Sequence, residues 1–171
     1  MKNTGPIRWG ILACGGIARK FADDLAFVQD GYLAAVSSRD ISRAEEFASH
    51  YVPDVKCFGS YEAMLSSCEI DVVYIASPHG LHHEHTLLCL NAGLPVLCEK
   101  AFAINSKQVA EMIQTAREKK IFLMEALWTR FHPSIAKLQE ILASGVIGDI
   151  VHLAADFGFL AEYNTDARWF N

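Results

Sequence analysis

Short apolar segments alternate with amphipathic segments along most of this chain. Apolar runs with little polar interruption occupy residues 7–13, 32–36, 55–58, 71–76, 94–98 and 121–124. Such runs, bounded by Gly, Pro or polar residues, are typical of strands that are buried on both faces of a parallel sheet. Segments of helical character lie between them, at residues 17–27, 42–51, 61–65, 82–91 and 106–119. We expect the second of these helices to have Ser42 as its N-cap. The alternation predicts an α/β fold, a doubly wound parallel sheet with right-handed crossovers.

The alternation of apolar and amphipathic segments changes after Met124. Residues 133–144 predict a helix, 145–149 a turn and 150–159 a longer strand, whereas 161–171 show no clear periodicity. We therefore expect residues 1–124 to form one α/β domain and residues 125–171 to begin an incomplete second, α+β domain. A strand at 150–159 would lack sheet partners in this chain, which favours self-association or poor solubility.

Composition narrows the function classes. The chain has 171 residues, of which 51% are hydrophobic and 20% charged, and its net charge is −5. The negative charge argues against nucleic-acid binding, which uses basic surfaces. No apolar stretch reaches the ~20 residues that a membrane span needs, and residues 1–6 lack the core of a signal peptide. The odd number of cysteines without a C-x-x-C motif predicts reduced thiols in a cytoplasmic protein: Cys14, Cys57, Cys68, Cys89 and Cys98.

A glycine turn follows the first predicted strand. Residues 13–18 read A-C-G-G-I-A, which is close to the dinucleotide-binding fingerprint G-x-G-x-x-G/A. Gly15 would let the backbone approach a pyrophosphate, and the amides of Gly16 and Ile17 would face that anion at the start of a helix. Ala13 replaces the first Gly, and we expect its φ to stay below zero. A turn without a ligand is the alternative, but the position at the start of a strand–helix series favours a Rossmann dinucleotide-binding domain.

The end of the second predicted strand indicates which dinucleotide is bound. NAD sites usually place Asp or Glu here, whereas this chain has Ser37, Ser38 and Arg39. Hydroxyl and guanidinium groups suit a 2′-phosphate, and Arg43 in the next helix would add a second charge. We therefore favour NADP(H) over NAD(H), although Asp40 is contrary evidence and Arg39 could be an ordinary exposed loop residue.

Four histidines crowd the turn after the strand at 71–76, namely His79, His82, His83 and His85. A metal site is not favoured, because these four cannot share one helix face and carboxylate or Cys partners at suitable spacing are lacking apart from Glu84. We expect Ser77, Pro78, His79 and His82 to border the cofactor instead.

Two charged residues, Glu99 and Lys100, end the strand at 94–98. Ligands of open α/β sheets bind beyond the carboxyl ends of the strands, so this pair is expected to face a ligand. Lys100 could supply a positive charge or a proton there. An ion pair between the two is a weaker interpretation, because adjacent strand residues point to opposite faces.

Together these motifs resemble the glucose-fructose oxidoreductase / inositol dehydrogenase (Gfo/Idh/MocA) family. Residues 11–19, 37–39, 77–82, 96–100 and 124–131 occur in the family's order and spacing. Residues 124–131 and 155–158 are most similar to its dimeric dihydrodiol dehydrogenase branch. The resemblance implies an NADP(H)- or NAD(H)-dependent oxidoreductase that transfers hydride at the CH–OH group of a sugar, polyol or trans-dihydrodiol, and a homo-oligomer formed through the sheet of the second domain.

The resemblance also implies residue roles. Glu99 and Lys100 match the family's Glu-Lys-Pro motif, whose Lys lies next to the nicotinamide and the substrate hydroxyl, and Ala101 replaces its Pro. Trp128 and Phe157 match aromatic positions of the substrate pocket, although both could be core aromatics.

Two further positions also correspond to the family pattern. Arg130 matches a position near the cofactor, and His79 stands where the family usually has Asn.

Family members usually have about twice this length, with acid/base residues of the second domain downstream of position 171. Two hypotheses of different class follow: an oxidoreductase or its cofactor half, and a nucleotide-binding fragment without turnover. A methyltransferase interpretation of the glycine turn leaves Arg39, Glu99 and Lys100 unexplained.

Overall fold

The computed structural model describes residues 5–51, 54–67, 69–158, 160, 163 and 165. The chain divides into two compact units, residues 1–127 and 128–171. The division falls shortly after the boundary that we predict at residue 124.

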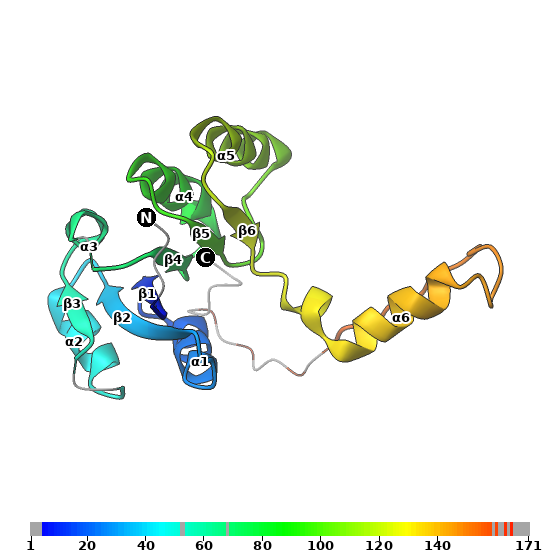
Figure 1. Ribbon diagram of the computed structural model, residues 1–171, viewed down its shortest axis with the longest axis horizontal. Coiled ribbons are helices and arrows are strands. Elements are labelled where there is room, and N and C mark those ends of the chain that lie inside the picture. The colour runs from blue at the N-terminus through cyan, green and yellow to red at the C-terminus, as the bar shows by residue number, and fades with distance from the viewer. Residues whose placement is uncertain are drawn as a thin grey trace. The chain divides into compact units, whose positions relative to one another are not determined.

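The first unit is built on a six-stranded parallel sheet (Figure 1). Its strands are β1 (Ile7–Leu12), β2 (Gly31–Ser37), β3 (Lys56–Phe58), β4 (Val72–Ile75), β5 (Val96–Cys98) and β6 (Leu123–Glu125). They pair in parallel in the order β3-β2-β1-β4-β5-β6. The order runs outward from β1 in both directions, so the predicted doubly wound α/β sheet is confirmed.

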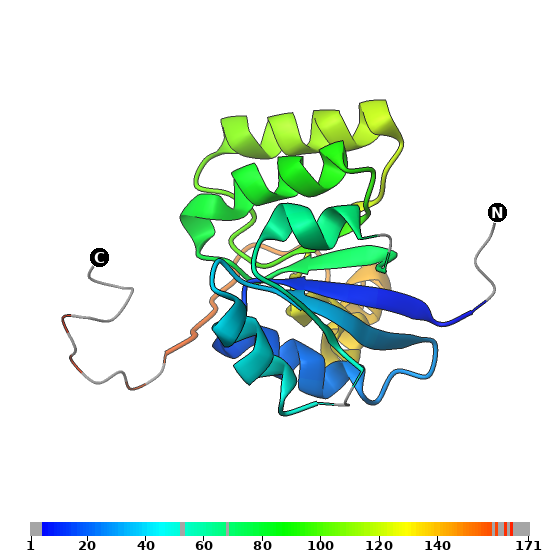
Figure 2. The ribbon, with the colours of Figure 1, turned by 90° about the vertical axis from the view of Figure 1, so that its left-hand side faces the viewer.

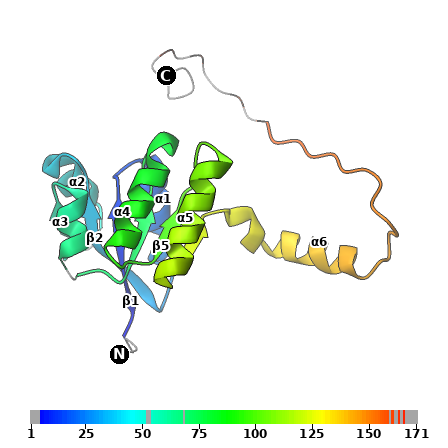
Figure 3. The ribbon, with the colours of Figure 1, turned by 90° about the horizontal axis from the view of Figure 1, so that it is seen from above.

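Helices cover both faces of this sheet (Figure 2). They are α1 (Gly16–Leu25), α2 (Ile41–Ala48), α3 (Tyr61–Ser66), α4 (His82–Asn91), with the short 3₁₀ helix η1 (His79–Leu81) before it, and α5 (Ser106–Lys119). Neighbouring strand residues point to opposite faces: Ile11 packs in the core under α1 and α2, and Leu12 in the core under α3, α4 and α5. Figure 3 shows α4 and α5 side by side. The inner strands β2 and β4 are mostly buried, which agrees with their apolar sequences, whereas the outer strand β3 carries the exposed Lys56.

The start of α2 differs from our expectation. The helix begins at Ile41, and its N-cap is Asp40 rather than Ser42. The Asp40 carboxylate accepts hydrogen bonds from the Ser42 amide at 3.0 Å and the Ser42 hydroxyl at 2.9 Å. Asp40, predicted as contrary evidence against a 2′-phosphate, is thereby occupied in capping a helix.

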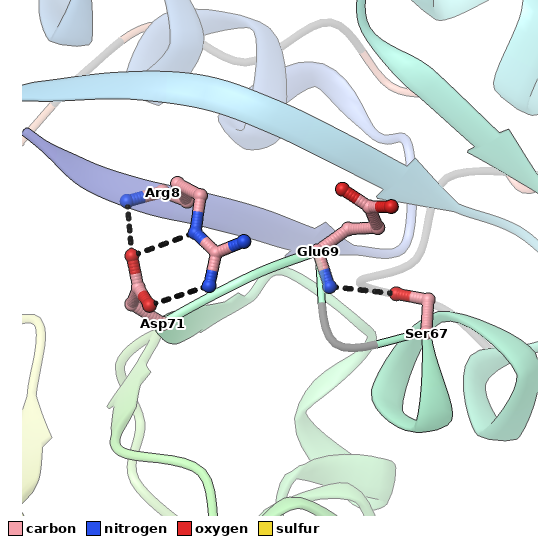
Figure 4. Close-up of polar contacts among 4 residues, drawn as sticks. All are labelled: Arg8, Ser67, Glu69 and Asp71. Atoms are coloured by element: carbon pink, nitrogen blue, oxygen red, sulfur yellow. Dashed lines mark hydrogen bonds and ion pairs between the residues drawn. The ribbon is translucent and has the colours of Figure 1, made fainter.

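The amino edge of the sheet carries an ion pair that explains the charged residue inside the first strand (Figure 4). The Arg8 guanidinium donates to both carboxylate oxygens of Asp71, at 2.8 and 3.0 Å, and the Arg8 amide donates to the same carboxylate at 2.9 Å. The Asp71 amide returns a bond to the Arg8 carbonyl at 2.8 Å. These contacts join the starts of β1 and β4, at the end of the sheet opposite to the predicted site.

The second unit contains the 3₁₀ helix η2 (Trp128–Phe131) and the helix α6 (Pro133–Ala143). Gly145 and Gly148 have φ of 70° and 68° and make the predicted turn. The strand that we predict at 150–159 is wrong over residues 150–158, which form no strand, and residue 159 lies outside the described residues. A strand needs a neighbouring backbone to bond with, and no described segment pairs with this one.

No described helix is both long enough and apolar enough to cross a membrane.

Candidate functional site

The carboxyl edge of the sheet gathers the segments that follow four neighbouring strands. Because the strands are parallel, the residues after β1, β2, β4 and β5 emerge at this one edge. The residues that the sequence analysis singled out in the first unit lie in these segments, at positions 13–17, 37–43, 77–82 and 99–100. The sheet topology therefore brings them to the same end of the fold.

The first turn differs from our expectation at Ala13, whose φ is +77° rather than below zero. The Ala13 amide donates to the Ser37 carbonyl at 3.0 Å, which ties the turn to the end of β2 and holds this residue in the left-handed region. The backbone thus takes the conformation that the fingerprint's first Gly adopts easily. Ala18 is fully buried, as expected for the small residue where helix and sheet pack closely.

The start of α1 is open. Gly15 is the N-cap and offers no side chain to the first amides of the helix. A Cβ built on Gly16 would meet nothing within 4 Å, and Gly15, Gly16 and Ile17 are all exposed. Uncapped amides beside free space can bind an anion, helped by the helix dipole.

Replacing Ala13 by Gly tests the strained turn. The left-handed conformation costs an L-residue about 1–2 kcal/mol of folding free energy, which Gly avoids. Gly also gives the unfolded chain more freedom, which lowers stability by about 0.4–1 kcal/mol. Ala13→Gly should therefore leave stability unchanged or raise it by up to about 1.6 kcal/mol, as measured by urea unfolding. Ala110→Gly on the exposed side of α5 is the control and should lose about 1 kcal/mol. Equal losses in both variants would contradict the strained geometry.

The four residues predicted to bind a 2′-phosphate form two pairs, of which the serines are buried and the arginines exposed. Ser37, Ser38 and Arg39 lie at the end of β2 and just after it, and Arg43 lies in α2. Ser37 is fully buried and its hydroxyl donates to the Ile11 carbonyl at 3.2 Å, and Ser38 is buried with its hydroxyl oxygen near the Asp40 amide. Arg39 and Arg43 are exposed, and in the described part of the chain neither guanidinium forms an ion pair. The serines therefore shape the turn, while the arginines present charge to solvent.

The two arginines also act on the groups around the first turn. Burial raises the pKa of the Cys14 thiol to about 11, and the nearby charges of Arg43 and Arg19 oppose this rise. Burial also raises the pKa of Tyr61, and the charges of Arg39 and Arg43 oppose it. The thiol in the turn is therefore neutral at physiological pH.

The histidines after β4 have separate partners. His82 is fully buried, and its Nδ1 and Nε2 lie 2.7 and 2.8 Å from the carbonyl oxygens of Ala101 and Ser77. His85 is buried and bonds the Ser77 hydroxyl at 2.9 Å, and burial lowers its pKa. His83 pairs with Glu111 on α5 at 3.0 Å.

Only part of this histidine turn is accessible. Pro78 is exposed and His79 is partly exposed, whereas the buried rings of His82 and His85 leave no surface to a ligand. Among the described residues, no group of three or more His, Cys, Asp or Glu could hold a metal ion.

The turn after β5 presents Lys100 to solvent. We call residues 99–102 the Lys100 turn. The Glu99 carboxylate accepts a hydrogen bond from the Tyr74 hydroxyl at 2.6 Å and another from the Lys100 amide at 3.1 Å. The peptide bond between Lys100 and Ala101, where the family motif has Pro, is cis. Lys100 is exposed and, in the portion of the chain described here, forms no ion pair with Glu99.

Two residues at this edge were missed by sequence reasoning. Tyr74 on β4 bonds Glu99, and Glu125 at the end of β6 accepts a hydrogen bond from the Phe102 amide at 2.9 Å. The sequence did contain a signal for Glu125. Glu99 follows the apolar run at 94–98 and Glu125 follows the run at 121–124, and these runs form the neighbouring strands β5 and β6. Tyr74 gave no signal within its apolar run.

The remaining predicted residues belong to the second unit. Trp128 and Arg130 lie on η2, where the Trp128 ring makes an edge contact with His132 at a centroid distance of 4.8 Å. Trp128 is 57% exposed and Phe157 is 88% exposed, so neither is a core aromatic within its unit.

Comparison with known proteins identifies the family. The model of an oxidoreductase family described as having an NAD-binding Rossmann fold matches residues 7–127, which are most of this chain. The chain belongs to the Gfo/Idh/MocA oxidoreductase family. The resemblance stated from the sequence motifs is therefore confirmed.

Relatives within the Gfo/Idh/MocA family include named dehydrogenases. The trans-1,2-dihydrobenzene-1,2-diol dehydrogenase of Mus musculus is 44% identical over 156 residues, which cover 90% of this chain and 46% of that protein. The D-xylose 1-dehydrogenase (NADP(+)) of Hypocrea jecorina is 40% identical over 170 residues, which cover 93% of this chain and 44% of that protein. The chain thus spans about half the length of these relatives.

A solved structure shares the fold. The 3-ketoreductase of Actinomadura kijaniata in complex with NADP is 32% identical, with a TM-score of 0.77, over 85% of this chain and 46% of that chain.

Proposed function

We propose that this chain binds NADP(H) at the carboxyl edge of its sheet and serves a hydride transfer at the CH–OH group of a small polyhydroxy compound. The observation that carries the proposal is the convergence of three features at one edge: the uncapped start of α1, the exposed guanidiniums of Arg39 and Arg43, and the exposed Lys100. Membership of the Gfo/Idh/MocA family supports it.

The residues present fit a dinucleotide phosphate. The amides of Gly15, Gly16 and Ile17 would hold the pyrophosphate, because no side chain caps them and space is free beside Gly16. Arg39, with Arg43 one turn into α2, would hold a 2′-phosphate through charge-assisted hydrogen bonds. The names of the NADP-dependent xylose dehydrogenase and of the NADP-bound ketoreductase support NADP(H) rather than NAD(H).

Lys100 would be the reactive side chain in this unit. When bound, the nicotinamide supplies or accepts the hydride. The Lys100 ammonium would stabilise the negative charge that develops on the substrate oxygen and would hold or release the proton there. The Glu99 carboxylate is bonded to Tyr74, and among the described residues no carboxylate pairs with the Lys100 ammonium, which is therefore available to a substrate oxygen.

The relatives support a proposal for the substrate class. Sugars, polyols and trans-dihydrodiols share a secondary alcohol with a neighbouring hydroxyl, and the relatives include a xylose dehydrogenase and a dihydrodiol dehydrogenase. We propose that Trp128 and Phe157 line the pocket for this carbon skeleton and that Arg130 lies near the cofactor. Self-association through the second unit stays a prediction.

The experiment that tests the proposal is a fluorescence titration with NADPH and NADH, run beside an assay of dihydrodiol and sugar oxidation. NADPH should bind more tightly than NADH. Gly16→Asp should weaken NADPH binding at least about ten-fold, because the new carboxylate would repel the pyrophosphate. Asp in the first turn of a helix is favourable, so this variant should fold.

The control variant for this titration is Gln114→Glu. Gln114→Glu adds the same charge on α5 and should bind NADPH like the unmodified chain. Absence of binding by both nucleotides would refute the proposal. Binding without oxidation of any substrate would instead favour the alternative of a nucleotide-binding module without turnover.

A further inference from the structure

The Lys100 turn is held by side chains from three separate elements. The Tyr74 hydroxyl on β4 donates to the Glu99 carboxylate at 2.6 Å. A ring nitrogen of His82, at the start of α4, lies 2.7 Å from the Ala101 carbonyl oxygen. The Glu125 carboxylate at the end of β6 accepts from the Phe102 amide at 2.9 Å. The three contacts therefore restrain the residue before Lys100 and both residues after it.

Each of these side chains is itself fixed. Tyr74 is 2% exposed and its ring stacks on Phe21 at a centroid distance of 3.9 Å. Burial and the bond to Glu99 raise the pKa of Tyr74 well above its usual range, so its hydroxyl keeps the proton that it donates. His82 is fully buried and its second ring nitrogen lies 2.8 Å from the Ser77 carbonyl oxygen, so its ring lies between the turn after β4 and the Lys100 turn.

Glu125 is fixed by the sheet. It pairs in register with Cys98, the last residue of β5, and the Ala126 amide donates to the Cys98 carbonyl at 2.7 Å. The backbone of β6 thereby sets where the Glu125 carboxylate can reach the Lys100 turn. Lys100 receives none of these three contacts, and in the described residues its exposed ammonium forms no ion pair.

We infer that Tyr74, His82 and Glu125 are positioning residues, which fix the backbone on both sides of Lys100 so that its ammonium meets the bound cofactor and substrate oxygen in one orientation. The inference rests on the proposed function, because it concerns the same site. It assigns His82 a role in holding the turn rather than in contacting the cofactor, which agrees with its complete burial.

Tyr74→Phe is the mildest test, because it removes the hydroxyl and keeps the ring that stacks on Phe21. Glu99 loses its donor, so NMR-detected exchange of the Lys100 amide should become about ten-fold faster. In the unmodified chain, saturating NADPH should slow acylation of the Lys100 amine, as measured by peptide mass spectrometry. In Tyr74→Phe this protection should fall about ten-fold, because the loss of one hydrogen bond lowers the population of the correctly oriented Lys100 turn by about that factor.

Three further variants separate positioning from a general loss of stability. Tyr32→Phe makes the same chemical change on β2 at a half-exposed site and should leave exchange and protection unchanged. Glu125→Leu should behave like Tyr74→Phe, whereas Glu125→Gln should restore most of the protection because its amide oxygen still accepts from Phe102. A merely structural role would lower the melting temperature but would not change the protection of Lys100 at saturating NADPH.

The outcomes distinguish this inference from the proposed function. Faster exchange and lost protection in Tyr74→Phe and Glu125→Leu, with rescue in Glu125→Gln, support the positioning role. Normal NADPH binding together with unchanged exchange and protection in these variants overturns the positioning role alone. Absence of NADPH binding by the unmodified chain overturns the proposed function and this inference with it.

Discussion

Lys100→Met is expected to lower kcat about 10²–10⁴-fold while changing the Kd for NADPH by less than about three-fold. Met has nearly the length of Lys but carries neither the charge nor the proton that the substrate oxygen needs in the transition state. Lys100 is exposed on a turn whose neighbours are anchored, so the substitution should leave the fold intact. The measurement is steady-state kinetics with NADP(H) and a panel that contains D-xylose and a trans-dihydrodiol.

A matched control for this variant is Lys119→Met. Lys119 is exposed in the last turn of α5, so its loss removes the same charge and length without touching the carboxyl edge. It should keep both kcat and the NADPH affinity. Unchanged turnover in Lys100→Met would remove Lys100 from the reaction, and a large loss of NADPH affinity would make it a binding residue instead.

Arg39→Ala is expected to raise the Kd for NADPH about 10–100-fold and to leave the Kd for NADH nearly unchanged. The guanidinium would make charge-assisted hydrogen bonds to the 2′-phosphate, each worth about 1.5–3 kcal/mol, and NADH lacks this group. In the described residues Arg39 makes no ion pair that the substitution would break. Fluorescence titrations with both nucleotides at one fixed ionic strength measure the difference.

The comparison variant is Arg117→Ala, in the last turn of α5, which removes one positive charge elsewhere on the surface. It should shift both dissociation constants little. Equal weakening of NADPH and NADH in Arg39→Ala would mean that Arg39 stacks on adenine or supports the turn. A preference for NADH already present in the unmodified chain would refute the 2′-phosphate assignment for Arg39 and Arg43.

The order of elements was predictable from the sequence because it depends on burial alone. Strands buried on both faces need uninterrupted apolar runs, and the runs at 71–76 and 94–98 contain the observed β4 and β5. The exact start of a helix depends on small energy differences between neighbouring residues that can act as its N-cap. Asp40 and Ser42 are both good caps, and the acidic residue is one position before Ile41, where its carboxylate reaches the orphan amide.

The positive φ of Ala13 could not be predicted, because it is imposed by a bond between segments that are distant in the chain. Local energetics favours a negative φ for Ala, but the bond from its amide to the Ser37 carbonyl fixes the turn. The burial of Ser37 and His82 was equally hidden, since a sequence does not show which way a side chain turns at a strand end. The strand predicted at 150–159 is wrong over residues 150–158, because pairing partners rather than composition decide whether a strand forms there.

The candidate site was predictable to the level of segments. Motif spacing placed Gly16, Arg39 and Lys100 in the segments that follow three strands, and the sheet order brings these segments to one edge. The contacts of Tyr74 and Glu125 could be found only in the structure, because each connects residues more than 20 positions apart along the chain. The roles of these residues toward a cofactor stay predictions.

The hydrogen bonds around Lys100 all come from residues 74–125, within the first compact unit. The amine that we propose as reactive is therefore oriented by residues of the unit that we propose to bind the cofactor. We therefore expect that second units with different substrate preferences can be joined to this unit without altering the hydrogen bonds that hold the Lys100 turn.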